Sequence, residues 1–141
     1  MATIVSKEYA QDVLNAVVGT IYTGDFEVAL LKSAPTITNG TLSITGAELS
    51  TVADEGYARI TVPVADFSAA TGNNPSSLSN DNDLLTEYNT GEDAWQSINY
   101  VALIHGSKVL MCLQTSAPVS IASSRRVRIP AGSLVLRMAS A

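Results

Sequence analysis

Hydrophobic and polar positions follow a helical period at the start of the chain and a period of two or a short apolar run over most of the remainder. Between residues 6 and 19 the apolar positions recur three and four residues apart, at Tyr9, Val13, Leu14 and Val17. Ser6 can cap the first turn, and Gly19 can end the helix in the left-handed conformation. We therefore expect one amphipathic helix over residues 6–19. Its apolar stripe should pack on the domain's own sheet or, as the alternative, on a neighbouring subunit.

After the helix, short apolar segments alternate with turn residues. The expected strands are residues 26–31, a short strand around Leu42 and Ile44, then 57–64, 98–105, 108–114, 119–122, 126–129 and 133–138. Gly106 and Ser107 fit a two-residue hairpin loop between the two most apolar strands. Because no helical period recurs between strands, the pattern predicts an all-β fold. We expect an antiparallel β-sandwich or jelly-roll-like domain with one N-terminal α-helix.

The length of the chain favours a single domain. Its 141 residues are enough for one hydrophobic core and too few for two comfortable ones, so the domain is expected to span residues 1–141. Residues 72–93 depart from the compact pattern because they are polar and acidic. Loops of this length in compact domains tend to be functional or disordered, and we expect a long polar loop here.

Charge is scarce and unevenly distributed. Charged residues make up 15% of the chain, and the formal net charge is -5. All 13 acidic residues lie in residues 1–93, whereas residues 94–141 carry only basic charges. The acidic total argues against nucleic-acid binding, which requires a surplus of Lys and Arg. The two parts are expected to attract each other, either within the fold or between neighbouring copies.

The sequence predicts neither a targeting segment nor a membrane helix. Polar and charged residues interrupt the N-terminal stretch too early for a signal peptide, and no apolar run approaches the ~18 residues that a spanning helix needs. We expect synthesis and assembly in a cytoplasm, without membrane contact. The single cysteine, Cys112, lies between Met111 and Leu113 and is interpreted as a buried small hydrophobe.

No motif indicates catalysis, a cofactor or a metal. The densest acidic segment, Asp81-Asn82-Asp83 with Glu87, lacks the glycine that a calcium-binding EF-hand loop has at its sixth position. His105 has no serine or cysteine on a nucleophile turn to act with. We therefore expect no enzymatic activity, no cofactor and no metal site.

Basic residues gather in the segment Arg125-Arg126-Val127-Arg128. Strand alternation would place Arg126 and Arg128 on one face and Val127 on the other. One interpretation is an exposed edge that discourages strand pairing. The other is a salt-bridging patch for an acidic partner or a neighbouring copy, with nucleic acid as a third option. Trp95, just before the most apolar strand, is expected to anchor the core or its rim.

Several short motifs follow one another along the chain. The helix YAQDVLNAVVG precedes the strand FEVALL, the motif from Gly56 to Arg59 (GYAR), an acid-Ala-Trp segment at Trp95 and the segment from Pro130 to Leu134 (PAGSL). In this order they resemble a widespread family of small virion proteins from tailed bacteriophages, variously labelled head decoration, cement or tail-fibre-like proteins. The likeness covers nearly the whole chain and carries over no catalytic residue.

The resemblance implies a structural protein of the virion, in first place a capsid decoration or cement protein that stabilises the head by binding the major capsid protein. It also implies contacts with neighbouring copies in a homo-oligomer, for which analogy suggests a trimer. Tyr57 and Arg59 lie in one of the strongest motifs. They join Trp95 and the three clustered arginines as the residues expected at interactions.

Two other functions stay open. The first is a tail or fibre component that contacts the host receptor, with residues 72–93 at its tip. The second is a carbohydrate-binding module, for which Trp95 and Tyr88 beside a polar loop are the only support.

Overall fold

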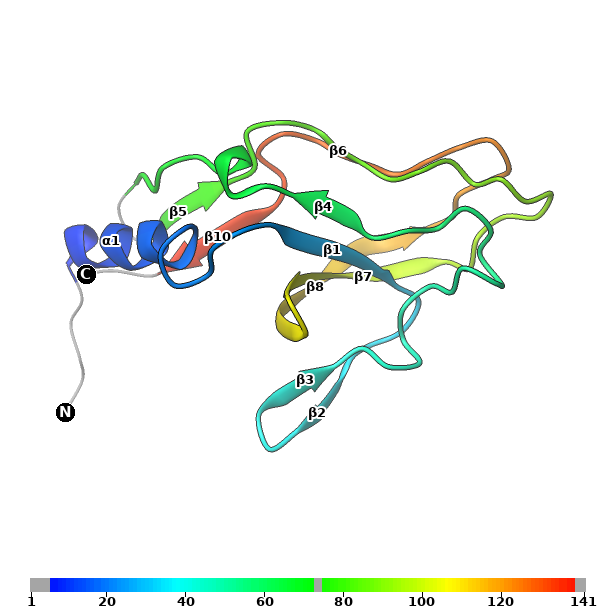
Figure 1. Ribbon diagram of the computed structural model, residues 1–141, viewed down its shortest axis with the longest axis horizontal. Helices are drawn as coiled ribbons and strands as arrows, with labels where there is room; N and C mark the ends of the chain where they lie inside the picture. The colour runs from blue at the N-terminus through cyan, green and yellow to red at the C-terminus, as the bar shows by residue number, and fades with distance from the viewer. Residues whose placement is uncertain (1–5, 73–74, 139–141) are drawn as a thin grey trace. The chain divides into compact units, whose positions relative to one another are not determined.

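The computed structural model describes residues 6–72 and 75–138, and its contacts divide the chain into two compact units. Unit 1 comprises residues 1–25, 63–84 and 129–141, and unit 2 comprises residues 26–62 and 85–128 (Figure 1). The architecture is mostly β, with antiparallel sheets and one N-terminal helix, as the sequence predicts. The predicted single domain over residues 1–141 stays a prediction.

Helix α1 (Lys7–Val17) opens unit 1 close to the predicted limits. The Ser6 hydroxyl accepts a hydrogen bond from the Tyr9 amide at 3.2 Å, and Gly19 has a φ of 109°, which confirms both helix ends. The predicted place of Tyr9 in the buried stripe is wrong. Its side chain is 58% exposed, because Ala10, one residue further around the helix, takes the inward position.

Among the described residues, no helix has both the length and the apolar character needed to span a membrane.

The helix packs against a two-stranded sheet of the same unit (Figure 1). This sheet pairs β5 (Ser76–Ser79) with β10 (Val135–Met138) antiparallel, and places the buried Leu78 opposite the buried Leu136. A short 3-10 helix, η1 (Val64–Asp66), precedes β5 in sequence. Two short strands interrupt the predicted long loop over residues 72–93, and its other described residues lie outside strands and helices. The segment forms β5 and also β6 (Leu84–Leu85), which pairs with β9 (Arg128–Ile129).

Asn80 fixes the turn that follows β5. Its amide nitrogen donates to the carbonyl oxygens of Asn82 and Pro130 at 2.8 and 3.1 Å, and its side-chain oxygen accepts from the Leu134 amide at 2.9 Å. The side chain is 1% exposed, so these bonds replace the water that the same groups would otherwise bind. The polar residue ties the turn to the C-terminal segment before β10.

Unit 2 is built on a four-stranded antiparallel sheet in the order β4-β1-β7-β8. Its strands are β4 (Ile60–Val62), β1 (Phe26–Leu31), β7 (Ile98–His105) and β8 (Lys108–Val119). β1 and β7 have the predicted limits, and Gly106 and Ser107 form the predicted turn. β4 is shorter than predicted and ends before Pro63, whereas β8 continues through Val119, so the separate strand predicted over 119–122 is not formed.

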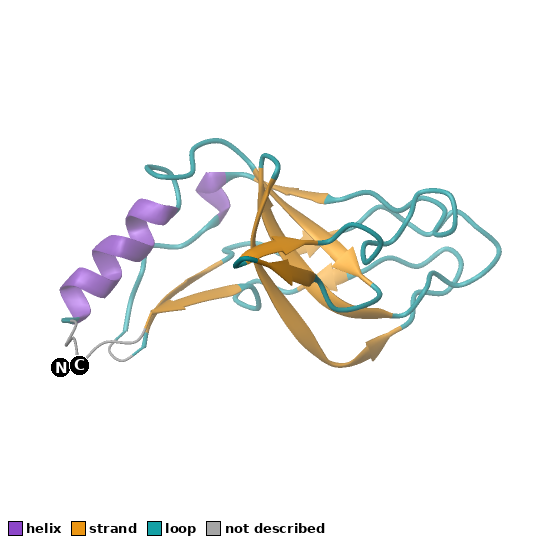
Figure 2. Ribbon diagram, turned by 90° about the horizontal axis from the view of Figure 1, so that it is seen from below, coloured by secondary structure: helices purple, strands orange, loops and turns teal. Residues whose placement is uncertain are grey.

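A hairpin of β2 (Thr36–Thr38) and β3 (Thr41–Ser43) extends from this unit. Asn39 and Gly40 form its turn with φ values of 52° and 77°, the left-handed pair that a type I′ hairpin turn requires. The β2 residues are all exposed, and Ile37 is 69% exposed. In the described part of unit 2, every segment outside the strands is a loop or turn (Figure 2).

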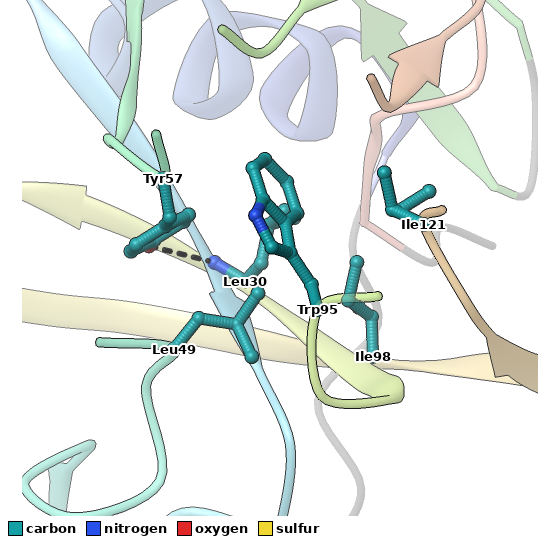
Figure 3. Packing of buried hydrophobic residues seen from close by; sticks show 6 residues of the cluster. All are labelled: Leu30, Leu49, Tyr57, Trp95, Ile98 and Ile121. Atoms are coloured by element: carbon teal, nitrogen blue, oxygen red, sulfur yellow. Dashed lines mark hydrogen bonds between the residues drawn. The ribbon is translucent and has the colours of Figure 1, made fainter. Parts of the chain in front are cut away.

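Buried side chains of unit 2 form two clusters. One gathers Leu30, Leu49, Tyr57, Trp95, Ile98 and Ile121 (Figure 3). The other gathers Ala29, Leu31, Ile44, Ala102 and Ile104. Neighbouring residues of β1 enter different clusters because successive strand side chains point to opposite faces. The sheet is therefore covered on both faces, which explains why five of the six β1 residues are buried.

We predict that Asn80→Ala lowers the free energy of unfolding by about 2–3 kcal/mol, because it leaves two carbonyl oxygens and one amide without a buried partner. Denaturant titration measures this change. The matched control is Asn82→Ala, which removes one exposed 3.3 Å bond to Asp66 and should cost less than about 0.5 kcal/mol. Equal losses in the two variants would show that Asn80 does not organise the turn.

Candidate interaction site

Three loops of unit 2 lie against one another, and we call them the loop platform: residues 50–57, 86–95 and 121–127 (Figure 1). Backbone hydrogen bonds connect them directly. The Thr90 amide donates to the Glu55 carbonyl at 3.1 Å, and the Trp95 amide donates to the Ile121 carbonyl at 3.0 Å. Loops held on a sheet in this way can present side chains to a partner at little entropic cost.

Asp54 braces the first loop from the inside. One carboxylate oxygen accepts from the Ser50 amide at 2.9 Å, and the other accepts from the Gln96 amide at 2.7 Å. The Ser50 hydroxyl in turn accepts from the amides of Val52 and Ala53 at 3.1 and 3.0 Å. The carboxylate is fully buried and also accepts from the Gln96 side-chain amide at 3.1 Å, so these bonds hold the loop in place.

Asn89 braces the second and third loops. Its amide nitrogen donates to the carbonyls of Asp93 and Ile121 at 2.9 and 3.0 Å, and its side-chain oxygen accepts from the Gly91 amide at 2.9 Å. Its backbone amide also donates to the Arg125 carbonyl at 2.7 Å. The side chain and the backbone of Asn89 together therefore position the loop that carries the clustered arginines.

Trp95 and Tyr57 form the apolar base of the platform. Their rings meet edge to face with centroids 6.0 Å apart, and their side chains are 3% and 5% exposed (Figure 3). The Trp95 indole donates to the Glu55 carbonyl at 2.9 Å, which satisfies its only donor. Both predicted interaction residues are thus core residues here, and neither ring has a face open to a ligand.

The exposed side of the platform carries an aromatic–arginine pair. The Arg126 guanidinium carbon lies 4.5 Å from the centroid of the Tyr88 ring, a cation–π arrangement, and Tyr88 is 49% exposed. In the described part of the chain, Arg125 and Arg126 have no carboxylate within ion-pair distance. Val52, in the first loop, is 87% exposed. The platform therefore offers positive charge, an aromatic ring and an aliphatic side chain.

Arg59 is held in an ion pair behind Tyr57. Its Nε donates to Glu48 at 2.9 Å and its second terminal nitrogen donates to the other Glu48 oxygen at 3.0 Å, while Glu27 lies at 3.5 Å. The Tyr57 hydroxyl donates to Glu48 at 2.7 Å and accepts from the Leu30 amide at 3.2 Å. The network joins β1 to Glu48 and to two residues of the GYAR motif itself.

The ion pair lowers the pKa of its acidic member and raises the pKa of its basic member. Burial raises the pKa of Glu48, but the hydrogen bonds from Arg59 and Tyr57 and the charge of Arg59 together outweigh it, so the pKa is lowered. Burial and the hydrogen bond to Glu48 raise the pKa of the Tyr57 phenol. The hydrogen bond to Glu48 raises the pKa of Arg59. All three groups keep their usual protonation states near neutral pH.

Arg59 also lines a hollow of about 320 Å³ between β3 and the β7–β8 turn, with Leu42, Ile104 and Val109 among the other lining residues. Glu48 already accepts from two of its guanidinium nitrogens, and Glu27 lies near the third. Across residues 6–72 and 75–138, no three His, Cys, Asp or Glu side chains gather as a metal site. Cys112 is partly buried, and burial raises its pKa.

The structure groups the predicted interaction residues around the platform. Trp95 and Tyr57 lie beneath it, Arg125 and Arg126 are exposed on it, and Arg59 connects to it through Glu48 and Tyr57. Arg128 is exposed at the start of β9, and the partial burial of Val127 matches the predicted alternation.

Sequence reasoning missed three polar residues that shape the site: the buried Asp54 and Asn89 and the partly buried Glu48. Ser50 and Asp54 are four residues apart, one more than the standard capping box has, although the two side chains do cap this turn reciprocally. No comparable local pattern marks Asn89, whose partners lie up to 36 residues away in sequence.

No protein family, curated protein or solved structure matches this chain. The resemblance to phage virion proteins therefore remains a hypothesis that rests on the motifs of the sequence.

We predict that Gly56→Ala destabilises the fold far more than Gly46→Ala. Both glycines have a positive φ, of 87° and 78°, so each substitution costs about 1–2 kcal/mol of backbone strain. A Cβ at Gly56 would lie 2.3 Å from the Tyr88 carbonyl oxygen, whereas a Cβ at Gly46 would meet nothing within 4 Å. Denaturant titration should show about 2 kcal/mol more loss for Gly56→Ala. Similar losses would mean that the first two loops are not packed together.

We also predict an acid-dependent contribution from Glu48. Because its folded pKa is lowered, its charge stabilises the fold fully above the unfolded pKa near 4.5, and this contribution is lost as pH falls through the folded value. Unfolding free energies of wild type and Glu48→Gln should differ by about 1 kcal/mol near pH 7 and converge at low pH. Glu27→Gln, which removes only the 3.5 Å contact, is the control and should show a smaller difference. A constant gap for Glu48→Gln at all pH values would contradict the assignment.

Proposed function

We propose that this protein is a structural component of a tailed-phage virion that decorates and stabilises the capsid by binding the major capsid protein. The observation that carries the proposal is the Arg126–Tyr88 pair on a platform braced by Asp54 and Asn89. The family resemblance of the sequence motifs supplies the identity of the partner. In this proposal the protein acts through contact area and shape, and performs no catalysis.

The composition of the platform suits a protein–protein contact. Tyr and Arg are enriched among the residues that contribute most to such interfaces, because each combines apolar surface with directional polar groups. Here the stacked pair is exposed, and its backbone is fixed by buried hydrogen bonds before any partner arrives. Binding would then require little further ordering, so more of the contact free energy is retained as affinity.

The charges favour an acidic surface on the partner. Arg125 and Arg126 are both exposed, and within the described residues neither forms an ion pair. A carboxylate on the shell would gain a charge-assisted hydrogen bond without breaking an internal one. Acidic side chains of a neighbouring copy offer the same chemistry, and we propose association of copies in a homo-oligomer, with the trimer suggested by analogy.

The finer description of the fold is also a proposal. A β-sandwich or jelly-roll-like packing agrees with antiparallel pairing and with the burial of both faces of the four-stranded sheet. We further propose a location in the virion, with neither nucleic acid nor membrane as a partner.

The second candidate function is a tail or fibre component, which would use the same exposed platform against a host receptor. Binding to host cells instead of shells would favour it. The carbohydrate-binding alternative had two supporting aromatic residues, Trp95 and Tyr88. Trp95 is buried, so only Tyr88 offers an exposed ring to a sugar.

The proposal predicts that Arg126→Glu lowers occupancy on shells assembled from the major capsid protein of the phage that encodes this chain. Loss of the cation and repulsion of acidic groups should weaken binding about tenfold or more, with added salt weakening the wild type as well. Quantitative pull-down with shells measures this.

Lys7→Glu is the matched control, since it makes the same charge change at an exposed position of α1 and should leave occupancy unchanged. Equal occupancy of wild type and Arg126→Glu would remove the platform from the interface. A wild-type chain that binds no shell would refute the capsid role itself.

A further inference from the structure

β8 is the outermost strand of the unit 2 sheet, and in the described part of the chain no strand pairs with it on its outer side. It is also the longest strand, with 12 residues. Val109 to Leu113 are all partly exposed. β3 contacts β8, and Val109 and Cys112 pack against the second cluster of buried side chains, but no described strand continues the ladder beyond β8. An open strand edge of this kind presents a row of backbone donors and acceptors with which another extended chain can pair.

The opposite edge of the sheet shows how an edge is normally protected. β4 has only three residues, and Pro63 follows it directly. β8 differs, because its segment from Val109 to Val119 contains no charged side chain. Its protective features lie near its ends, where Lys108 begins the strand and Pro118 comes just before its last residue.

Two irregularities define the part of β8 that can pair regularly. The register shifts at Leu110, and again over residues 115–118, where one β7 residue faces four residues of β8. Between them, Met111 to Gln114 pair with β7 without interruption. A partner strand should therefore align on these four residues, because bulged backbone does not continue a ladder.

We propose that the β8 edge pairs with β8 of a second copy of this chain, antiparallel about a twofold axis at Cys112, so that Cys112 faces Cys112 of the second copy and Met111 faces Leu113 of the second copy. The contact would join the two four-stranded sheets into one continuous sheet. This self-contact is independent of the capsid role and of the trimer suggested by analogy.

The sequence of β8 fits a copy of itself. Two uncharged, apolar windows can approach without repulsion, and each supplies the aliphatic cross-strand neighbours that the other lacks. The antiparallel arrangement places the two Lys108 side chains at opposite ends, whereas a parallel arrangement would bring them together. A twofold contact of this kind is self-complementary and closes on itself, so it yields a defined dimer rather than a filament.

Disulfide cross-linking tests the register, because Cys112 is the only cysteine of the chain. Oxidation of the wild-type protein should give a Cys112–Cys112 dimer, since cross-strand neighbours lie within reach of a disulfide. The control places the cysteine elsewhere on the same strand, as Val119→Cys in a Cys112→Ser background. Val119 faces Ile98, four β7 residues away from Ala102, which faces Cys112. The antiparallel pair would hold those two sulfurs roughly 25 Å apart at about 3.3 Å per residue, so about tenfold less cross-linked dimer is expected.

Sedimentation equilibrium tests the affinity. Gln114→Lys adds a charge inside the window at an exposed position that should not disturb folding, and we expect about tenfold weaker dimerisation. Ser116→Lys adds the same charge at an exposed position in the irregular segment and should change the dimerisation constant by less than about twofold.

A strictly monomeric wild type, or a trimer without the Cys112 cross-link, would overturn the proposal. A cross-link through Val119→Cys would overturn the antiparallel orientation. Protection of Cys112 from thiol labelling only on assembled shells, in a chain that is otherwise monomeric, would assign the edge to a shell protein instead.

Discussion

The buried carboxylate of Asp54 and the buried amide of Asn89 are the interactions on which the loop platform depends. Long loops without regular strand pairing leave many backbone amides and carbonyls unmatched, and burying them unmatched would cost several kcal/mol. Here these two side chains accept from or donate to several of the backbone groups. The Trp95–Tyr57 pair can then fill the space beneath, so polar bracing and apolar packing are parts of one arrangement.

A buried asparagine side chain also organises the backbone in unit 1. Asn80 is buried and bonded to the chain before β10, much as Asn89 is bonded to the chain before β9. Both asparagines lie in the polar segment over residues 72–93 that looks unstructured from its composition. In each case a short polar side chain reaches backbone groups distant in sequence, which allows the segment to be ordered with few apolar residues.

The sequence correctly predicted those elements whose limits depend on residues close together in the chain. The apolar runs of β1 and β7 and the Gly106-Ser107 turn have the expected limits, and so do the caps of α1. The extent of β4 and the order within residues 72–93 were not predictable, because distant partners decide them. For the site, the sequence indicated the clustered arginines and Trp95. It could not show that Trp95 is buried or that Tyr88 lies beside Arg126, since both depend on how the loops fold together.

The β2–β3 hairpin has a practical consequence for protein engineering. Its turn closes with Asn39 and Gly40, and the β2 residues before that turn are all exposed. Added residues at this tip would extend the chain into solvent without entering either cluster of buried side chains. The hairpin is therefore the place to graft a foreign epitope or an affinity tag, leaving the folded units unaltered and the graft displayed.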